Sequence, residues 1–155
     1  MTIAEDALIE FFGTQDEVTT SPATVADAAY SIASDTSEWT NDDDAPFAMF
    51  RLLLTAAGLG GAPTGDVNLY AQCIDIDGST GDQAFPSDNF PHTYLGTFPI
   101  LRTDTDQQSV IGPIKLPNYK TSSTFVFVIQ NQMGVATGAT WTLHVTPVTY
   151  GPHPA

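Results

Sequence analysis

The segment Asp66-Val-Asn-Leu-Tyr-Ala-Gln-Cys73 decides the fold class of this chain, because its side chains alternate between apolar and mixed. Every second residue from Val67 to Cys73 is apolar, and this period of two is typical of a half-buried β-strand. A second segment of strand type, Thr93–Phe98, follows an acidic, glycine-containing loop. We expect the remaining strands to pack around these two.

Four further segments also carry strand patterns. Phe47–Thr55 is the most hydrophobic segment, and its alternation places Arg51 on the less buried face. Thr124–Gln130 is apolar on both faces, which indicates a central strand buried between layers. Ser109–Leu116 contains Pro113, which predicts an edge strand or a bulge. The alternating residues from Trp141 to Pro147 are expected to close the sheet.

The first part of the chain is less regular. Residues 3–12 fit a short helix or an opening strand, and we favour the strand. Val25–Ile32 holds small side chains and is expected to form the next strand, at an edge or in a tightly packed layer. Asp35–Asp44 surrounds Trp39 with carboxylates and is predicted to be a loop that leads into the core strand. The glycines of Ala56–Gly65 indicate a connection.

Roughly seven to nine short strands without a long helix predict an all-β fold, namely an antiparallel β-sandwich. We expect jelly-roll topology, with an immunoglobulin-like sandwich as the alternative. The length of 155 residues fits one domain, residues 1–155, with a sizeable core. The single cysteine, Cys73, forms no intramolecular disulfide and is predicted to be a small buried residue on the inward face of its strand.

The charge is strongly acidic, with 18 Asp and Glu residues against four Lys and Arg residues and a net charge of −14. Such a field repels phosphate backbones and anionic membranes, so we expect no nucleic-acid partner and no membrane partner. The acidity fits either a saline habitat or a basic docking partner. The N-terminal residues resemble no signal peptide, and we expect a protein made in soluble form in a cytoplasm.

Candidate metal sites are weak in this sequence. Asp75, Asp77 and Asp82, with Gly78 for a sharp turn, resemble a calcium loop, but the pattern departs from an EF-hand and favours a solvated β-turn. The run Asp42–Asp44 is a poorer candidate, because consecutive side chains in an extended segment diverge. The spacing of the three histidines excludes a typical zinc site, and His144 is expected to project outward, the others being His92 and His153.

Catalytic motifs are also missing. The sequence has no Gly-x-Ser-x-Gly elbow, and its carboxylates gather in loops rather than beside aromatic clefts. We therefore predict that the chain is not an enzyme and has no cofactor, catalytic residue or metal ligand. Trp39, Trp141 and the tyrosines could stack on sugars, although core or interface packing is the favoured interpretation.

Several motifs resemble those of small structural proteins of tailed bacteriophages, over a span from Thr36 to His153. The motifs are Glu38-Trp39-Thr-Asn-Asp-Asp, Asn68-Leu-Tyr-Ala, Asp75-Ile-Asp-Gly, Asn89-Phe-Pro-His92-Thr-Tyr-Leu-Gly96, Leu116-Pro-Asn and Ala139-Thr-Trp141-Thr-Leu-His-Val-Thr-Pro147. This resemblance implies an accessory virion protein, and we expect a capsid decoration or cement protein bound to the outer head surface.

The partners that this resemblance implies are the major capsid protein or other virion proteins, together with further copies of the chain, most simply as a trimer. The expected localisation is the virion, after synthesis in the host cytoplasm. The alternative is a neck, tail or fibre component that acts as a host glycan or receptor-binding module.

Overall fold

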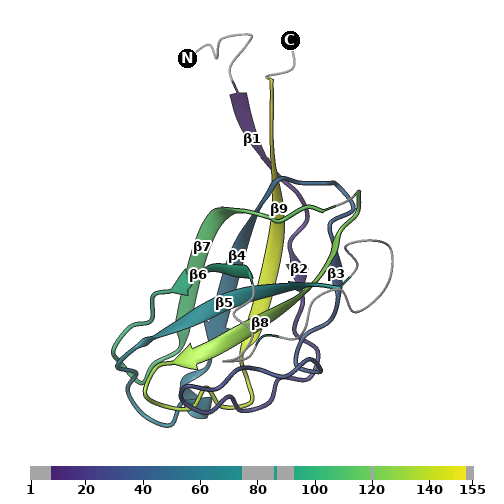
Figure 1. Ribbon diagram of the computed structural model, residues 1–155. Coiled ribbons are helices and arrows are strands. Elements are labelled where there is room, and N and C mark those ends of the chain that lie inside the picture. Colours follow the sequence, from purple (N-terminus) through teal and green to yellow (C-terminus); the bar gives the residue numbers. More distant parts are fainter. Residues whose placement is uncertain (1–7, 75–85, 87–92, 120, 153–155) are drawn as a thin grey trace, which may run out of the picture.

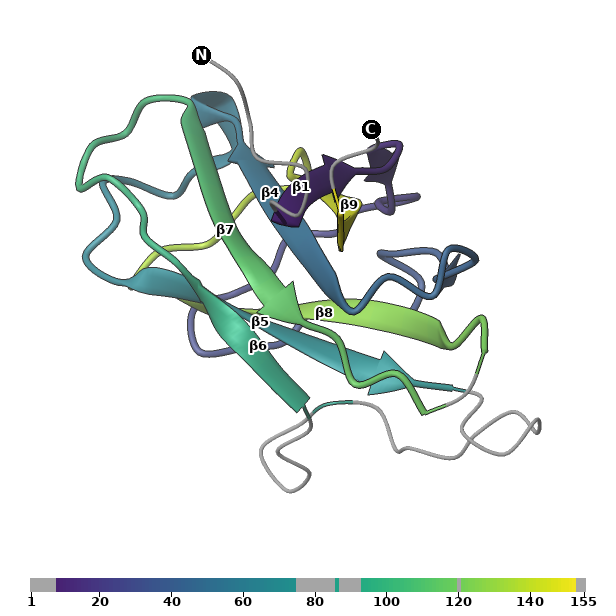
Figure 2. The ribbon, with the colours of Figure 1, turned by 90° about the horizontal axis from the view of Figure 1, so that it is seen from above.

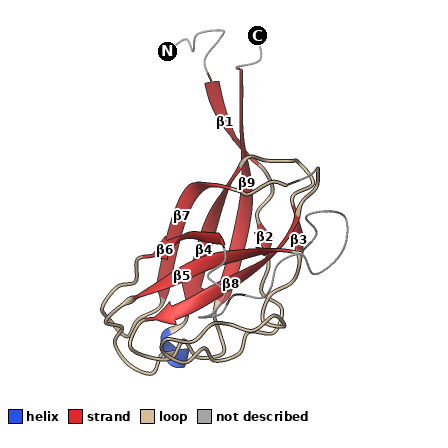
Figure 3. Cartoon of the chain, viewed as in Figure 1, coloured by secondary structure: helices blue, strands red, loops and turns tan. Residues whose placement is uncertain are grey.

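The computed structural model describes residues 8–74, 86, 93–119 and 121–152. Within these residues the chain forms strands and a single 3-10 turn, η1, as Figure 3 shows. The elements are β1 (Leu8–Phe12), β2 (Asp16–Glu17), β3 (Trp39–Thr40), β4 (Phe47–Leu54), η1 (Ala56–Gly58), β5 (Asp66–Cys73), β6 (Thr93–Phe98), β7 (Gln107–Lys115), β8 (Thr124–Gln132) and β9 (Thr142–Pro152).

The strands form two antiparallel sheets that pack face to face as a β-sandwich (Figure 2). The first sheet has the order β1-β9-β4-β7, with β2 also paired to β9, and the second has the order β3-β8-β5-β6. The antiparallel β-sandwich predicted from the number of short strands and the lack of a long helix is therefore confirmed.

The pairing is nested from the ends of the chain inward. The strands β1 and β2 pair with β9, β3 pairs with β8, β4 pairs with β7, and β5 pairs with β6. A long antiparallel hairpin wound into two layers gives this order, which is the jelly roll. In an immunoglobulin sandwich the last two strands share one sheet, whereas β8 and β9 lie in different sheets.

The core lies between the sheets and follows the predicted alternation. In β4 and β5 every second side chain is buried, from Ala48 to Leu54 and from Val67 to Cys73. Phe50 of the first sheet meets Phe127 of the second edge to face, with ring centroids 5.0 Å apart. Cys73 is buried in this core, as predicted.

The expected strand over Val25–Ile32 is not present. This segment runs beside β8 with one isolated bridge, between Tyr30 and Gln130. The backbone N–H of Ser31 donates to the Ile129 carbonyl oxygen over 2.8 Å, while the Ser31 hydroxyl accepts from the N–H of Ile129 over 3.1 Å. Side chains thus take over part of the hydrogen bonding that a regular ladder would supply.

The acidic run Asp35–Asp44 is not the continuous loop that its composition predicts. It contains β3, and Asp35 is buried with 1 % exposure. The Asp35 carboxylate accepts from the backbone N–H of Ala23 over 3.0 Å and of Ile32 over 2.8 Å. One of the five carboxylates therefore stabilises the fold from within.

The remaining strand predictions hold where the structure describes the chain. Residues 8–12 of the expected opening strand form β1, and residues 3–7 lie outside the described residues. The Pro113-containing strand, β7, lies at the edge of the first sheet, and its register against β4 shifts between Ala48 and Phe50.

Candidate functional site

A two-stranded ribbon extends beyond the sandwich, as Figure 1 shows. It consists of β1 and the last part of β9, with Leu8 opposite Pro152 and Phe12 opposite Val148. The pairing of β9 with β4 ends at Val148, so among the described residues β9 continues from Thr149 with β1 alone. An isolated two-stranded ribbon has marginal stability in water, which makes this element a candidate for contact with a partner.

The ribbon carries exposed aromatic side chains. Phe12 is 58 % exposed, and Tyr150 is exposed on the same face of the ribbon. Phe11 is exposed on the opposite face, next to Gly151. Phe47 pairs with Val148, and its ring meets that of Tyr150 edge to face at 5.2 Å. We call the ribbon residues 8–12 and 148–152, together with Phe47, the aromatic ribbon. These exposed aromatic residues make the ribbon a candidate interaction surface.

The Tyr150 hydroxyl fixes the two strands of the aromatic ribbon to each other. It donates to Oε1 of Glu10, the residue opposite it in register, over 3.0 Å. Loss of water contact and the neighbouring Glu10 carboxylate raise the pKa of Tyr150. The side chains of this surface are therefore partly pre-ordered.

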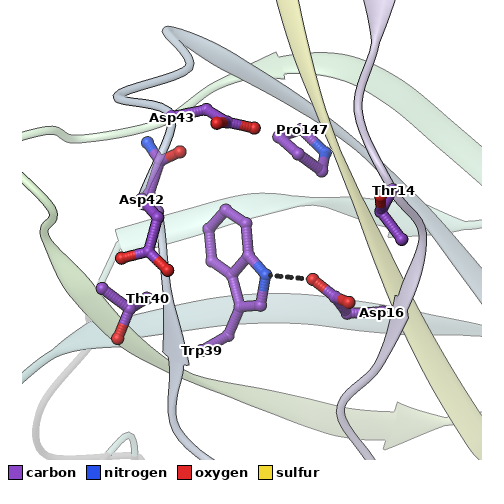
Figure 4. A pocket seen from close by; sticks show the side chains of 8 residues that line it. Thr14, Asp16, Trp39, Thr40, Asp42, Asp43 and Pro147 are labelled. Atoms are coloured by element: carbon purple, nitrogen blue, oxygen red, sulfur yellow. Dashed lines mark hydrogen bonds between the residues drawn. The ribbon is translucent and has the colours of Figure 1, made fainter.

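An acidic pocket of about 240 Å³ lies at the base of the aromatic ribbon (Figure 4). The Trp39 indole lies between Asp16 on one side and Asp42 and Asp43 on the other, and its Nε1 donates to Oδ2 of Asp16 over 3.0 Å. The lining residues are Thr14, Asp16, Trp39, Thr40, Asn41, Asp42, Asp43 and Pro147.

The chemistry of this acidic pocket favours contact with a cationic group over catalysis. Its volume is below the range of about 300–1,000 Å³ that small-molecule sites occupy. Asp42 and Asp43 are exposed, without the apolar enclosure of a glycosidase acid. Asp44 does not line the pocket. Its Oδ1 instead accepts from the backbone N–H of Ser122 over 2.6 Å. Within the described residues, no group of three or more His, Cys, Asp and Glu side chains is arranged to hold a metal ion.

His144 faces away from the core, as expected, but it is enclosed rather than free. Its Nε2 lies 3.3 Å from Nη2 of Arg51 and 3.7 Å from Oε2 of Glu17, and its side chain is 11 % exposed. Burial lowers the pKa of His144, Arg51 lowers it further, and Glu17 opposes both. We therefore expect the His144 imidazole to be neutral, with its Nε2 accepting a hydrogen bond from the Arg51 guanidinium.

Other predicted site residues either lie outside the described part or are buried. Asp75, Asp77, Asp82, His92 and His153 fall outside the described residues. Trp39 and Trp141 are buried in the core, so their ring faces are not a platform for sugars. The packing interpretation is confirmed for both.

No family model matches the chain, and no curated protein matches it in sequence. In the described ranges, no helix has the length and apolar character needed to cross a membrane.

Proposed function

We propose that this chain is a structural protein of a tailed-phage virion that decorates the outer head surface and stabilises the shell. The aromatic ribbon is the observation that carries the proposal. It projects from the jelly roll and presents Phe12 and Tyr150 on one face and Phe11 on the other, all of them exposed. Interfaces draw most of their binding energy from a few such aromatic residues.

Charge supports a basic partner at the same end of the molecule. The acidic pocket with Asp16, Asp42 and Asp43 lies at the base of the aromatic ribbon, in a chain with a net charge of −14. A basic capsid surface would complement these carboxylates and accelerate docking. Because of this charge, copies of the chain repel one another in solution. On a basic shell the charge is neutralised, and there the copies assemble as a ring, most simply a trimer.

The mechanism is mechanical. Each copy bridges neighbouring capsid subunits and binds only the assembled lattice, so that mass action stabilises the closed shell. Many copies that each bind weakly are sufficient to stabilise the shell. Each bound copy raises the free energy needed to open its own part of the lattice.

The test compares particles that lack the protein with particles to which the purified protein is added. We expect addition to raise the temperature at which DNA is released. The double variant Phe12→Ser with Tyr150→Ser should bind poorly and give no increase. Val110→Ser is the matched control, because Val110 is exposed in the same sheet but lies in β7, outside the aromatic ribbon. Equal release temperatures with and without the wild-type protein would reject the cement role.

Copy number in the intact particle separates the head from other positions. Hundreds of copies fit head decoration, whereas a dozen or fewer fit a ring at the neck or tail.

A further inference from the structure

The outward face of the second sheet carries tyrosine, amide and hydroxyl side chains in register. Asn68 of β5 pairs with Gln130 of β8 on one side and with Thr97 of β6 on the other. In the next outward row Tyr70 pairs with Tyr94, and Tyr30 reaches the face through its bridge to Gln130. We call these six residues the tyrosine–amide face.

A β-bulge in β6 creates this arrangement. Leu69 pairs with Gly96 and Tyr70 pairs with Tyr94, so Leu95 has no partner of its own in the register. Tyr94 and Thr97 therefore point to the same side although they are three residues apart, and the Tyr94 hydroxyl lies 2.6 Å from Oγ1 of Thr97. Strict alternation would have placed them on opposite sides.

The three tyrosine rings lie next to one another across the sheet. Tyr70 is in the middle, with ring centroids 5.7 Å from Tyr30 and 5.6 Å from Tyr94. The ring planes are tilted by 55° and 64°, so neighbouring rings alternate in orientation. Tyr94 is 54 % exposed and the other two are half-buried, which leaves aromatic surface open to solvent.

Hydrogen bonds hold the polar side chains of this face in place. Oε1 of Gln130 accepts from the Tyr70 hydroxyl over 3.1 Å and from Nδ2 of Asn68 over 3.2 Å. Oδ1 of Asn68 accepts from the Thr97 hydroxyl over 2.7 Å. Gln130 is 8 % exposed, and no described residue accepts from its Nε2, so its amide hydrogens can donate to a ligand that lies directly over it.

The tyrosine–amide face carries no charged side chain among the residues that form it. From Asn68 onward the outward residues of β5, β6 and β8 include no Asp, Glu, Lys or Arg, in a chain with a net charge of −14. Asp66, the first residue of β5, pairs with Arg102 over 3.0 Å. A basic partner would bind better at the acidic pocket, and an apolar partner would bind better at the aromatic ribbon. The tyrosine–amide face therefore suits a ligand that is polar but uncharged.

We propose that the tyrosine–amide face binds an extended, uncharged glycan chain laid across β8, β5 and β6. The C–H faces of sugar rings pack on tyrosines, and sugar hydroxyls pair with the amide and hydroxyl groups between them. The hydrogen bonds within the face hold these groups in place before binding, which limits the entropy lost on association. This inference does not depend on the decoration role.

The experiment uses the full chain and isothermal titration with maltohexaose, cellohexaose and chitohexaose. At least one of these neutral probes should bind in the millimolar range or tighter, and anionic oligogalacturonate should not bind. Tyr94→Ala should weaken binding about tenfold through loss of an aromatic contact, whereas Tyr94→Phe should retain most of it. Gln130→Ala should also weaken binding.

The control variant is Tyr119→Ala, because Tyr119 is 47 % exposed but lies outside the face. Thermal unfolding of each variant establishes that it folds, and Tyr94 is exposed enough for truncation to be tolerated. Failure of all three neutral probes would overturn the proposal, as would an equal loss in Tyr119→Ala. If Tyr94→Ala abolishes binding to phage heads without changing glycan binding, the face is a protein-docking surface instead.

Discussion

Trp39 and Asp16 join the two sheets of the sandwich through one hydrogen bond, from the indole Nε1 to the carboxylate Oδ2 over 3.0 Å. Trp39 belongs to β3 of the second sheet and Asp16 to β2, which pairs with β9 of the first. The indole also packs against the rings of Phe125 and Phe127, with centroids 6.3 and 5.9 Å away. A core side chain thus holds a two-residue strand at the surface.

Asp16→Ala should therefore lower the free energy of unfolding by about 1 kcal/mol, the typical net value of one hydrogen bond. Asp16→Asn should cost less, because the amide oxygen still accepts from the indole. Urea unfolding measures both. Asp104→Ala controls for charge, since it removes an exposed carboxylate from a different loop and relieves the same net repulsion. An Asp16→Ala variant as stable as this control would show that the bond contributes nothing.

The buried carboxylate of Asp35 should matter more than any exposed acid. It accepts two backbone hydrogen bonds, and bonds to charged groups contribute about 1.5–3 kcal/mol each. We expect Asp35→Ala to destabilise the chain by about 3 kcal/mol and Asp35→Asn by roughly half, because the amide keeps one acceptor oxygen. Glu38→Ala, at an exposed position of the same run, should change stability little. A mild effect of Asp35→Ala in urea unfolding would contradict this role.

Asp35 and its neighbours also show where the sequence misleads. Period-two patterns located β4, β5 and β9, because burial on one face of a strand imposes alternation. A run that is apolar on both faces located β8, and the strand-type residues 93–98 located β6. Val25–Ile32 failed as a strand, since its hydrogen bonds depend on side chains far away in sequence, such as the Thr137 hydroxyl that accepts from Val25 N–H over 3.0 Å. The acidic composition around Asp35 likewise concealed a buried acceptor.

The candidate surfaces were harder to find than the strands. The pattern of residues 3–12 predicts a strand. Only the strand register shows that β9 extends beyond its pairing with β4 and continues, paired with β1, outside the sandwich. Tyr94 and Thr97 lie on the same face because of the β-bulge at Leu95. A prediction from strict alternation would place them on opposite faces. The preference for packing over sugar stacking was right for the tryptophans, whereas Tyr94 is exposed.

Leu52 and Leu53 form a matched pair that tests the two faces of β4. Leu52 is buried in the core, whereas Leu53 faces outward and is half-buried. We expect Leu52→Ala to lower the free energy of unfolding by about 2–5 kcal/mol through lost burial and a residual cavity. Leu53→Ala should cost well under half as much. Equal losses in urea unfolding would contradict the alternation.

Acidification should destabilise the fold through His144. Its pKa in the folded chain is lowered by burial and by Arg51, while the unfolded chain keeps the ordinary value of 6.5. As the pH falls through that value, the unfolded state binds a proton that the folded state still resists. The free energy of unfolding therefore falls with pH in this window, with a slope of at most about 1.4 kcal/mol per unit for one group.

His144→Gln removes this titrating group, so its stability should vary less than that of the wild type between about pH 7 and pH 5. Urea midpoints taken across this range measure the slope. Asp66, whose pKa is lowered by the hydrogen bond from the backbone N–H of Ile100, titrates below this window. The same slope in His144→Gln and in the wild type would place the pH dependence elsewhere.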